Sequence, residues 1–299
     1  MSDSLIPFGP LTFITGTKGG RYPYCHSLYI EEAGVLIDPA SNLEELQLIS
    51  QSKKAETIWL SHWHEDHIMY LNLFEELPIW MHEADAPPMT DLNTFIDWYI
   101  YPEPAYEKMR EGWGQMMVEM FNYKPRKISR YLTDGEVIDL GSVTVEVIHC
   151  PGHSPGSLSF YFREPQVLFL GDTDLTPFGP WYGDLYSDID EICQTVERLR
   201  NIPAKVWLTS HEQGVFESNP GSMWDDFLRV IDIREEKLLA FLKEPRTMVE
   251  IAGQWIVYGK PKQPLEMFAL IEEISMQKHL DRLIRKNIVE MDGDRYRII

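Results

Sequence analysis

The chain has 299 residues, of which 44% are hydrophobic, and this is ordinary for a globular protein that buries a large core. Its formal net charge of −20 disfavours phosphate-rich polymers as partners, because their binding requires Lys and Arg side chains to replace counterions. The sequence starts without the basic and apolar regions of a signal peptide, and no apolar run reaches the roughly 20 residues of a membrane span. Three cysteines, none in a CxxC pair, indicate reduced thiols. We therefore expect a cytoplasmic globular protein without a membrane span.

Short apolar runs bounded by Gly or Pro predict buried strands. Five such runs stand at residues 34–40, 57–60, 144–150, 166–170 and 205–210. Each run has an acid or a histidine at its end or just beyond it. In chain order these residues are Asp38, His62, His153, Asp172 and His211. Because α/β proteins bind their ligands at strand ends, we expect these polar side chains to form one site.

Three stretches have helical character. Residues 188–200 and 222–243 carry apolar side chains at three- and four-residue spacing, which is typical of helices that cover a core. Residues 85–130 are rich in aromatic residues and methionines, and the prolines of a YPEP sequence predict two helices rather than one. We expect this stretch to be a helical lid insertion. Farther along, Asp134-Gly135 predicts the turn of a β-hairpin.

The sequence HWHEDH, residues 62–67, gathers three of the nine histidines directly after a predicted strand. Such a cluster can be a solvated turn, but the concentration of histidine favours metal chemistry. His62 and His64 are two apart, so on an extended strand end both imidazoles point to the same side. Asp66 and His67 follow where the chain turns into a helix, which allows two neighbouring ions. Imidazole and carboxylate suit zinc, iron or manganese, and no cysteine is present to indicate structural zinc.

Together with the downstream residues, this motif resembles the signature of the metallo-β-lactamase superfamily, HxHxDH followed by a His, an Asp and a final His. The resemblance covers roughly residues 10–243 and implies an α/β fold of four αββα layers. It also implies two divalent metal ions, zinc first, with iron or manganese as alternatives. The implied ligands are His62, His64 and His153 for one ion, Asp66, His67 and His211 for the other, and Asp172 as the bridge.

The chemistry implied by the resemblance is hydrolysis by a hydroxide that bridges the two ions. Asp66 is also expected to be catalytic, as a proton acceptor and donor. Asp38 is either a carboxylate that orients a metal ligand or a turn residue before Pro39. The sequence favours neither interpretation of Asp38 over the other.

Two aromatic groups are expected to contact the substrate. Trp98 and Tyr99 belong to the predicted lid, where their large apolar surfaces would select an apolar substrate portion. Trp181, Tyr182 and Tyr186 follow the predicted bridging aspartate, and a phenol there would polarise a carbonyl oxygen. Both groups also have an explanation without a functional role. Trp98 and Tyr99 can be ordinary core residues, and the other three aromatic residues can simply pack a proline-rich loop.

The predicted function is metal-dependent hydrolysis of an ester-type bond, such as a thioester, lactone or phosphoester, in a small cytosolic molecule. Asp172 stands where lactamases of this fold have Cys or Ser, which argues against antibiotic hydrolysis. Two alternatives stay open: a nucleic-acid phosphodiesterase or endoribonuclease, and an oxidoreductase that resembles the persulfide dioxygenases, which use a single iron. The expected partner is a small molecule, with neither nucleic acid nor membrane, and self-association into a homo-oligomer is left open.

Residues 246–299 are expected to form an appendage after a catalytic domain at residues 1–245. They predict an amphipathic helix and two short strands joined at Asp292-Gly293, which is the pattern of a winged helix. A subgroup of the superfamily that includes an endoribonuclease has a similar tail. The segment carries nine Lys or Arg against eight Asp or Glu, and acids surround the predicted wing. We predict that it supports the pocket rim or a subunit contact and does not bind nucleic acid sequence-specifically.

Overall fold

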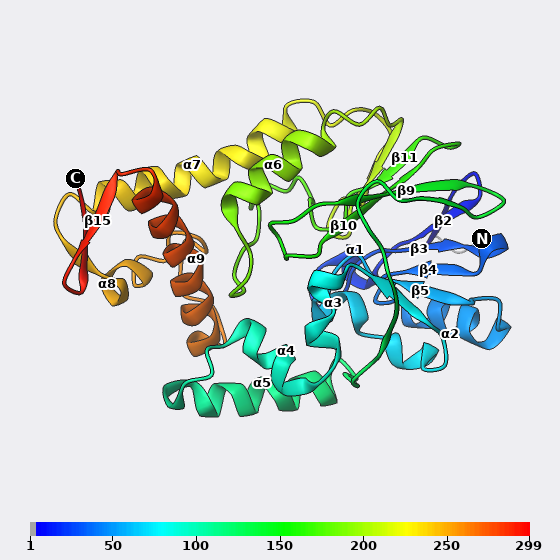
Figure 1. Ribbon diagram of the computed structural model, residues 1–299, viewed down its shortest axis with the longest axis horizontal. Coiled ribbons are helices and arrows are strands. Elements are labelled where there is room, and N and C mark those ends of the chain that lie inside the picture. The colour runs from blue at the N-terminus through cyan, green and yellow to red at the C-terminus, as the bar shows by residue number, and fades with distance from the viewer. Residues whose placement is uncertain (1–3) are drawn as a thin grey trace.

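Two β-sheets pack face to face in the computed structural model, which describes residues 4–299, and helices cover both outer sides (Figure 1). One sheet has seven strands in chain order, β1 to β7, and the other has six in the order β13-β12-β11-β10-β9-β8. Helices α2, α4 and α5 lie outside the first sheet, while α6 and α7 lie outside the second. The predicted αββα arrangement is confirmed.

The first sheet combines two kinds of pairing. Its strands are β1 (Leu5–Phe8), β2 (Leu11–Ile14), β3 (Ser27–Ile30), β4 (Val35–Ile37), β5 (Thr57–Trp59), β6 (Ile79–Met81) and β7 (Ile128–Tyr131). Strands β1 to β4 pair antiparallel, with the short α1 (Thr17–Gly20) between β2 and β3. Strands β4 to β7 pair in parallel and therefore need crossovers. The crossovers contain α2 (Leu43–Ser52), α3 (Glu65–Ile68), α4 (Leu92–Tyr99) and α5 (Glu107–Glu119).

The second sheet is mostly antiparallel. Its strands are β8 (Val137–Asp139), β9 (Thr144–His149), β10 (Leu158–Phe162), β11 (Val167–Phe169), β12 (Val206–Leu208) and β13 (Val215–Phe216). One parallel pair, β11 and β12, is joined through α6 (Ile189–Leu199). Helix α7 (Met223–Phe241) follows the last strand. The helices predicted at residues 188–200 and 222–243 are thus confirmed, and so are the two helices separated by the YPEP sequence.

Alternation of side chains along the strands builds the layers. In β10, Phe160 lies in the apolar core between the two sheets, whereas its neighbour Tyr161 packs against the core under α6 and α7. In β3, Leu28 points between the sheets and Tyr29 points to the helices outside the first sheet. Each sheet therefore buries apolar side chains on both faces.

The predicted hairpin has its turn at a different place. Strands β8 and β9 form the hairpin, and the chain turns between them at Gly141-Ser142. At Asp134-Gly135 the chain instead crosses from the first sheet to the second, because β7 and β8 belong to different sheets. Gly135 N–H already donates to the carbonyl of Val147 in β9, at 2.9 Å. A turn sequence does not determine which sheet its flanking strands join.

The C-terminal segment continues from α7, which runs from the sheets out to it (Figure 1). Its elements are β14 (Arg246–Thr247), α8 (Met248–Ala252), α9 (Leu265–Arg285), β15 (Val289–Asp292) and β16 (Arg295–Ile298), and its small sheet has the order β14-β16-β15. The two strands joined at Asp292-Gly293 are confirmed, and their likeness to a wing stays a prediction. Leu270 and Ile274 of α9 belong to the same apolar cluster as Trp63 and Trp98. Among residues 4–299, no helix has the length and apolar content that a membrane crossing requires.

Candidate metal centre

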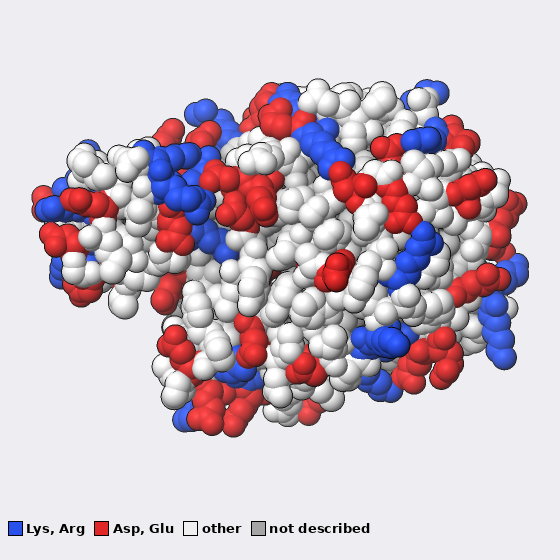
Figure 2. Space-filling view, in the orientation of Figure 1, with Lys and Arg blue, Asp and Glu red and all other residues white. Residues whose placement is uncertain are grey.

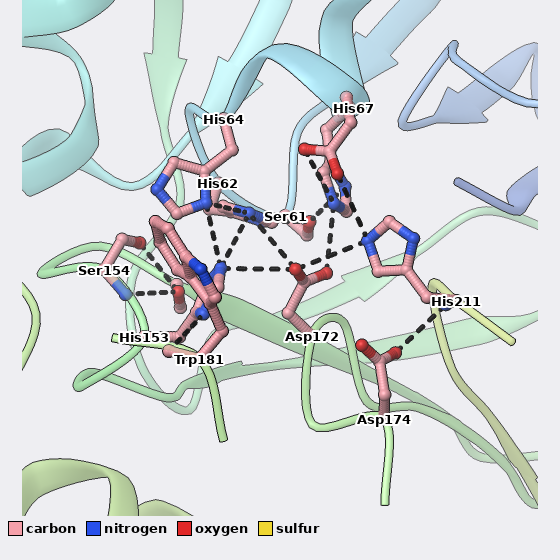
Figure 3. A network of polar contacts seen from close by, with 12 residues as sticks. Ser61, His62, His64, His67, His153, Ser154, Asp172, Asp174, Trp181 and His211 are labelled. Carbon is pink, nitrogen blue, oxygen red and sulfur yellow. Dashed lines mark hydrogen bonds and ion pairs between the residues drawn. The ribbon is translucent and has the colours of Figure 1, made fainter. Parts of the chain in front are cut away.

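The predicted ligands lie close together at strand ends of both sheets (Figure 3). After β5 the chain stays extended through His64, and α3 begins at the next residue. His153 lies in the loop between β9 and β10, Asp172 follows β11, and His211 follows β12. The seven predicted ligands therefore come together, although they are spread over four segments of the chain.

Four of these residues form a first group around a common point. His64 Nδ1 lies 3.0 Å from His62 Nε2 and 2.9 Å from His153 Nε2, and the latter two nitrogens are 3.2 Å apart. Asp172 Oδ2 lies 3.2 Å from His153 Nε2. All four ligand atoms lie within 4.8 Å of one another, with His62 and His64 buried and the other two residues partly buried.

Asp66, His67 and His211 form a second group beside the first. Asp172 faces this group too: its Oδ1 lies 3.0 Å from His67 Nε2 and its Oδ2 lies 3.4 Å from His211 Nε2. Asp66 Oδ2 lies 3.6 Å from His211 Nε2. The Asp172 carboxyl group is thus shared between the two groups, as expected of a bridge.

Hydrogen bonds at the ring nitrogens that face away from the cluster determine the tautomer of two histidines. His153 Nδ1 lies 3.1 Å from the main-chain oxygen of Trp181, and His211 Nδ1 lies 2.6 Å from that of Gly20. Because a carbonyl oxygen only accepts, each Nδ1 must carry a hydrogen, and in the neutral imidazole each Nε2 then directs a lone pair into the cluster.

Two buried carboxylates orient the rings of two histidines in the HWHEDH motif. Asp38 Oδ2 lies 3.0 Å from His67 Nδ1, while its other oxygen accepts the main-chain N–H of Ser61. Asp184 Oδ2 lies 3.0 Å from His64 Nε2. Of the two interpretations of Asp38, the orienting carboxylate is the one that agrees with this contact. Asp184 was not expected, because its loop contains no recognisable motif.

The donor set fits divalent metal ions. Lone pairs directed at one another across 2.9 to 3.2 Å repel, unless a cation lies between them. Zn–N distances of about 2.0 to 2.1 Å in tetrahedral geometry place two nitrogens roughly 3.3 Å apart, close to the spacing observed here. In addition, His67 Nε2 and Asp172 Oδ1 are buried and make no hydrogen bond of normal geometry. Their one close partner is each other, at 3.0 Å, and a cation between the two groups would satisfy both atoms.

Burial changes the proton affinity of two groups in the cluster. It lowers the pKa of His62 well below its usual value, and the neighbouring His67 adds to this effect, so the His62 imidazole is neutral. Burial raises the pKa of Asp174 to about 7 against the opposing effect of His211. Asp174 Oδ1 also accepts a hydrogen bond from the main-chain N–H of His211 at 3.0 Å. Asp174 is also near enough to Asp172 and His211 to form a third potential ligand group.

A cavity of about 410 Å³, counted with its solvent-open part, borders the first group at His62, His153 and Asp172. Its other walls include Trp181 and apolar side chains from α6 and α7. The Trp181 ring centroid lies 5.3 Å from that of His64, so this predicted substrate contact stands next to the cluster. Tyr186 is 50% exposed and packs on Trp98 at 4.4 Å between ring centroids.

The other three predicted substrate contacts lie in the core. Trp98 and Tyr99 are only 8% and 7% exposed, since both pack against the ring of Trp63. Tyr182 is 1% exposed, and its hydroxyl contacts His279 and Arg234 rather than the cavity. The burial of these side chains favours a structural role for all three.

Glu65 is a further residue that the motif did not single out. It lies between two predicted ligands, yet its carboxylate accepts hydrogen bonds from Tyr22 at 2.9 Å and Tyr99 at 2.5 Å. Burial and the adjacent Asp66 raise the pKa of Glu65 to about 7. The only sequence signal was its place inside the motif.

The metallo-beta-lactamase superfamily model matches residues 20–211, so the chain belongs to this superfamily. A solved structure of similar fold is the metallo-beta-lactamase family protein TTHA1429 from Thermus thermophilus. Its TM-score is 0.70 at 22% identity, and the match covers 97% of this chain and 99% of that one. The predicted family and fold are confirmed.

Two curated relatives are named acyl-coenzyme A thioesterase MBLAC2. The protein from Gallus gallus is 36% identical over 112 residues, which are 38% of this chain and 39% of the relative. The protein from Homo sapiens is 31% identical over 143 residues, which are 46% of this chain and 48% of the relative. The chain therefore spans about half the length, or less, of these two curated relatives.

Proposed function

We propose that the chain is a thioesterase that hydrolyses the thioester bond of a small acylated carrier and uses two divalent metal ions, zinc in the first instance. The observation that carries this proposal is the convergence of five imidazole lone pairs on the shared Asp172 carboxyl group. The thioesterase names of the two relatives favour a thioester over the lactone or phosphoester that the motif also allows.

His62, His64 and His153 would hold one ion, Asp66, His67 and His211 would hold the other, and Asp172 would contact both. When bound, the two ions lower the pKa of a shared water and polarise the substrate carbonyl. Water then adds across the C–S bond, which yields a carboxylic acid and a free thiol.

The chain's own side chains contribute orientation and proton transfer. Asp38 and Asp184 hold the rings of His67 and His64, which keeps their lone pairs directed inward. Asp66 is the proposed proton acceptor and donor, because its carboxylate belongs to the second group and its side chain is 12% exposed. Trp181 covers the first group and limits the access of water.

The test is metal analysis of protein purified without added metal, followed by a thioesterase assay with octanoyl-coenzyme A. We expect two ions per chain and turnover that Asp172→Asn abolishes while the fold persists. Asp225→Asn, on the exposed surface of α7, is the matched control and should leave both quantities unchanged. One ion per chain, or full turnover in Asp172→Asn, would refute the dinuclear thioesterase.

A further inference from the structure

The C-terminal segment reaches the metal centre through one aromatic contact. Trp181, whose ring lies 5.3 Å from that of His64, donates its indole N–H to the hydroxyl of Tyr258 at 3.3 Å. Tyr258 lies in the connection between α8 and α9. The C-terminal segment thus contributes to the surroundings of the cluster and not only to its own small core.

A buried carboxylate holds this connection in place. Glu272 of α9 is 0% exposed, and its two oxygens accept the main-chain N–H groups of Val257 at 2.9 Å and Tyr258 at 3.2 Å. The Tyr258 ring also packs on Phe178, in the loop after Asp172, at 5.8 Å between centroids. The position of Tyr258 is therefore fixed before any ligand arrives.

The rings of Tyr258 and Phe268 contact the ammonium group of Lys262, which has no acidic partner. Their rings are 5.1 Å apart, and Lys262 Nζ lies 4.9 Å from the first centroid and 5.8 Å from the second. Throughout the described part of the chain, no carboxylate lies within ion-pair distance of Lys262 or of Lys260.

The basic residues of α9 give the contrast. Arg282 pairs with Asp190 and Glu235, and Arg285 pairs with Asp190. Figure 2 shows basic side chains beside acidic ones in this part of the surface. These two arginines are paired with acids of the protein, whereas Lys262 contacts only the two aromatic rings.

We propose that Lys262, Tyr258 and Phe268 bind the phosphate-bearing, nucleotide-like portion of the thioester's carrier, and that Lys260 adds positive charge to this site. The proposal rests on the thioesterase function proposed above. A lysine ammonium attracts phosphate as a compact point charge, and the faces of the two rings hold this ammonium in position.

A series of contacts links the metal centre to Lys262. It runs from His64 through Trp181 and Tyr258 to the Lys262 ammonium. A pantetheine arm has about four residue lengths and extends on the order of 14 Å. We expect the acyl end of a substrate to lie at the metal centre while its phosphates lie at Lys262.

The experiment compares octanoyl-coenzyme A with octanoyl-pantetheine, which has the same thioester but no phosphate. Lys262→Ala should raise KM for octanoyl-coenzyme A about tenfold, the effect of one lost charge-assisted contact, with kcat within about twofold. KM for octanoyl-pantetheine should not change. Lys205→Ala is the control, because Lys205 is exposed and precedes β12, at the end opposite to His211.

Direct binding of coenzyme A and of pantetheine, measured by calorimetry, provides a second readout that needs no turnover. Native protein should bind coenzyme A more tightly than pantetheine, and Lys262→Ala should remove the difference. Equal effects of Lys262→Ala on both substrates, or none, would overturn this inference and leave the thioesterase intact. If native protein hydrolyses neither thioester, the proposed function fails and this inference fails with it.

Discussion

Asp184 accepts a hydrogen bond from His64 Nε2 at 3.0 Å while its second oxygen accepts the main-chain N–H groups of Tyr186 and Ser187. One carboxyl group therefore links a predicted metal ligand to the shape of a loop more than a hundred residues farther along the chain. Lys278 of α9 donates to the carbonyl of Ser187 at 2.7 Å, so the C-terminal segment anchors the same loop.

The first prediction concerns this carboxylate. Asp184→Ala should weaken metal affinity about 10- to 100-fold, because His64 loses the acceptor that fixes its ring and its tautomer. Competition with a chelator measures the affinity, and circular dichroism checks that the fold persists. Asp184→Asn should fall between native protein and Asp184→Ala, since an amide oxygen still accepts. Unchanged affinity in Asp184→Ala would show that the contact has no orienting role.

The second prediction concerns Lys278, whose hydrogen bond joins α9 to the loop that carries Asp184. Lys278→Met should weaken metal affinity several-fold while it changes the melting temperature little, because only the loop that carries Asp184 loses a contact. Lys286→Met is the control: it lies just beyond the same helix and makes no contact with that loop. Equal affinities in the two variants would contradict a link between α9 and His64.

The third prediction concerns acid stability. His26 is buried, its Nδ1 accepts the N–H of Gly16 at 2.9 Å, and burial lowers its pKa to about 4. The unfolded chain binds a proton there below about pH 6.5, and the folded chain does so only below about pH 4. Stability from this residue is therefore present above about pH 6.5 and lost as the pH falls towards 4.

Between about pH 7.5 and pH 5, the loss from His26 amounts to ~2 kcal/mol in the free energy of unfolding. Urea unfolding of metal-free protein at both pH values measures it. His26→Gln keeps an acceptor for Gly16 and should have a shallower pH dependence by that amount. If both proteins lose the same stability, His26 is not the group responsible.

The fourth prediction concerns Trp98. Because its ring packs against Trp63 and Tyr186 in the core, Trp98→Ala should cost about 3 to 5 kcal/mol of unfolding free energy. Denaturant unfolding measures the cost, with Tyr131→Ala on the exposed end of β7 as the control. A fully stable variant with only a raised KM would instead restore the interpretation of Trp98 as a lid residue.

The fifth prediction concerns nucleic acid. Labelled RNA and duplex DNA should not bind at physiological salt, because Arg282 and Arg285 are paired with Asp190 and the chain carries a net charge of −20. Micromolar or tighter binding that disappears when Arg282, Arg285 and Lys286 become Ala would contradict this and favour a nuclease.

The sequence predicts which His and Asp side chains come together around Asp172, because their pattern along the chain is local. Histidine is scarce, so its clustering after a strand is informative, and each downstream ligand also follows a strand. Asp184 and Glu272 escaped prediction because their partners, His64 and the main chain at Tyr258, are distant in sequence. Only the packed fold brings such pairs together.

Aromatic composition was a weaker guide. Trp98, Tyr99 and Tyr182 were predicted to contact substrate, yet all three are buried. Large aromatic side chains serve cores and binding surfaces alike, and the sequence does not state which face of a helix or loop meets solvent. Trp181 stands beside the cluster, where its main-chain carbonyl contacts the ring of His153.

The order of the ligands along the chain has a consequence during synthesis. A ribosome releases His62 to His67 long before His211, which completes the second group, and Asp172, which both groups share. A nascent chain can therefore offer an ion only an incomplete, flexible set of donors. Metal acquisition must wait until both sheets have been made and have closed on each other, so truncated products of this gene would remain free of firmly held metal.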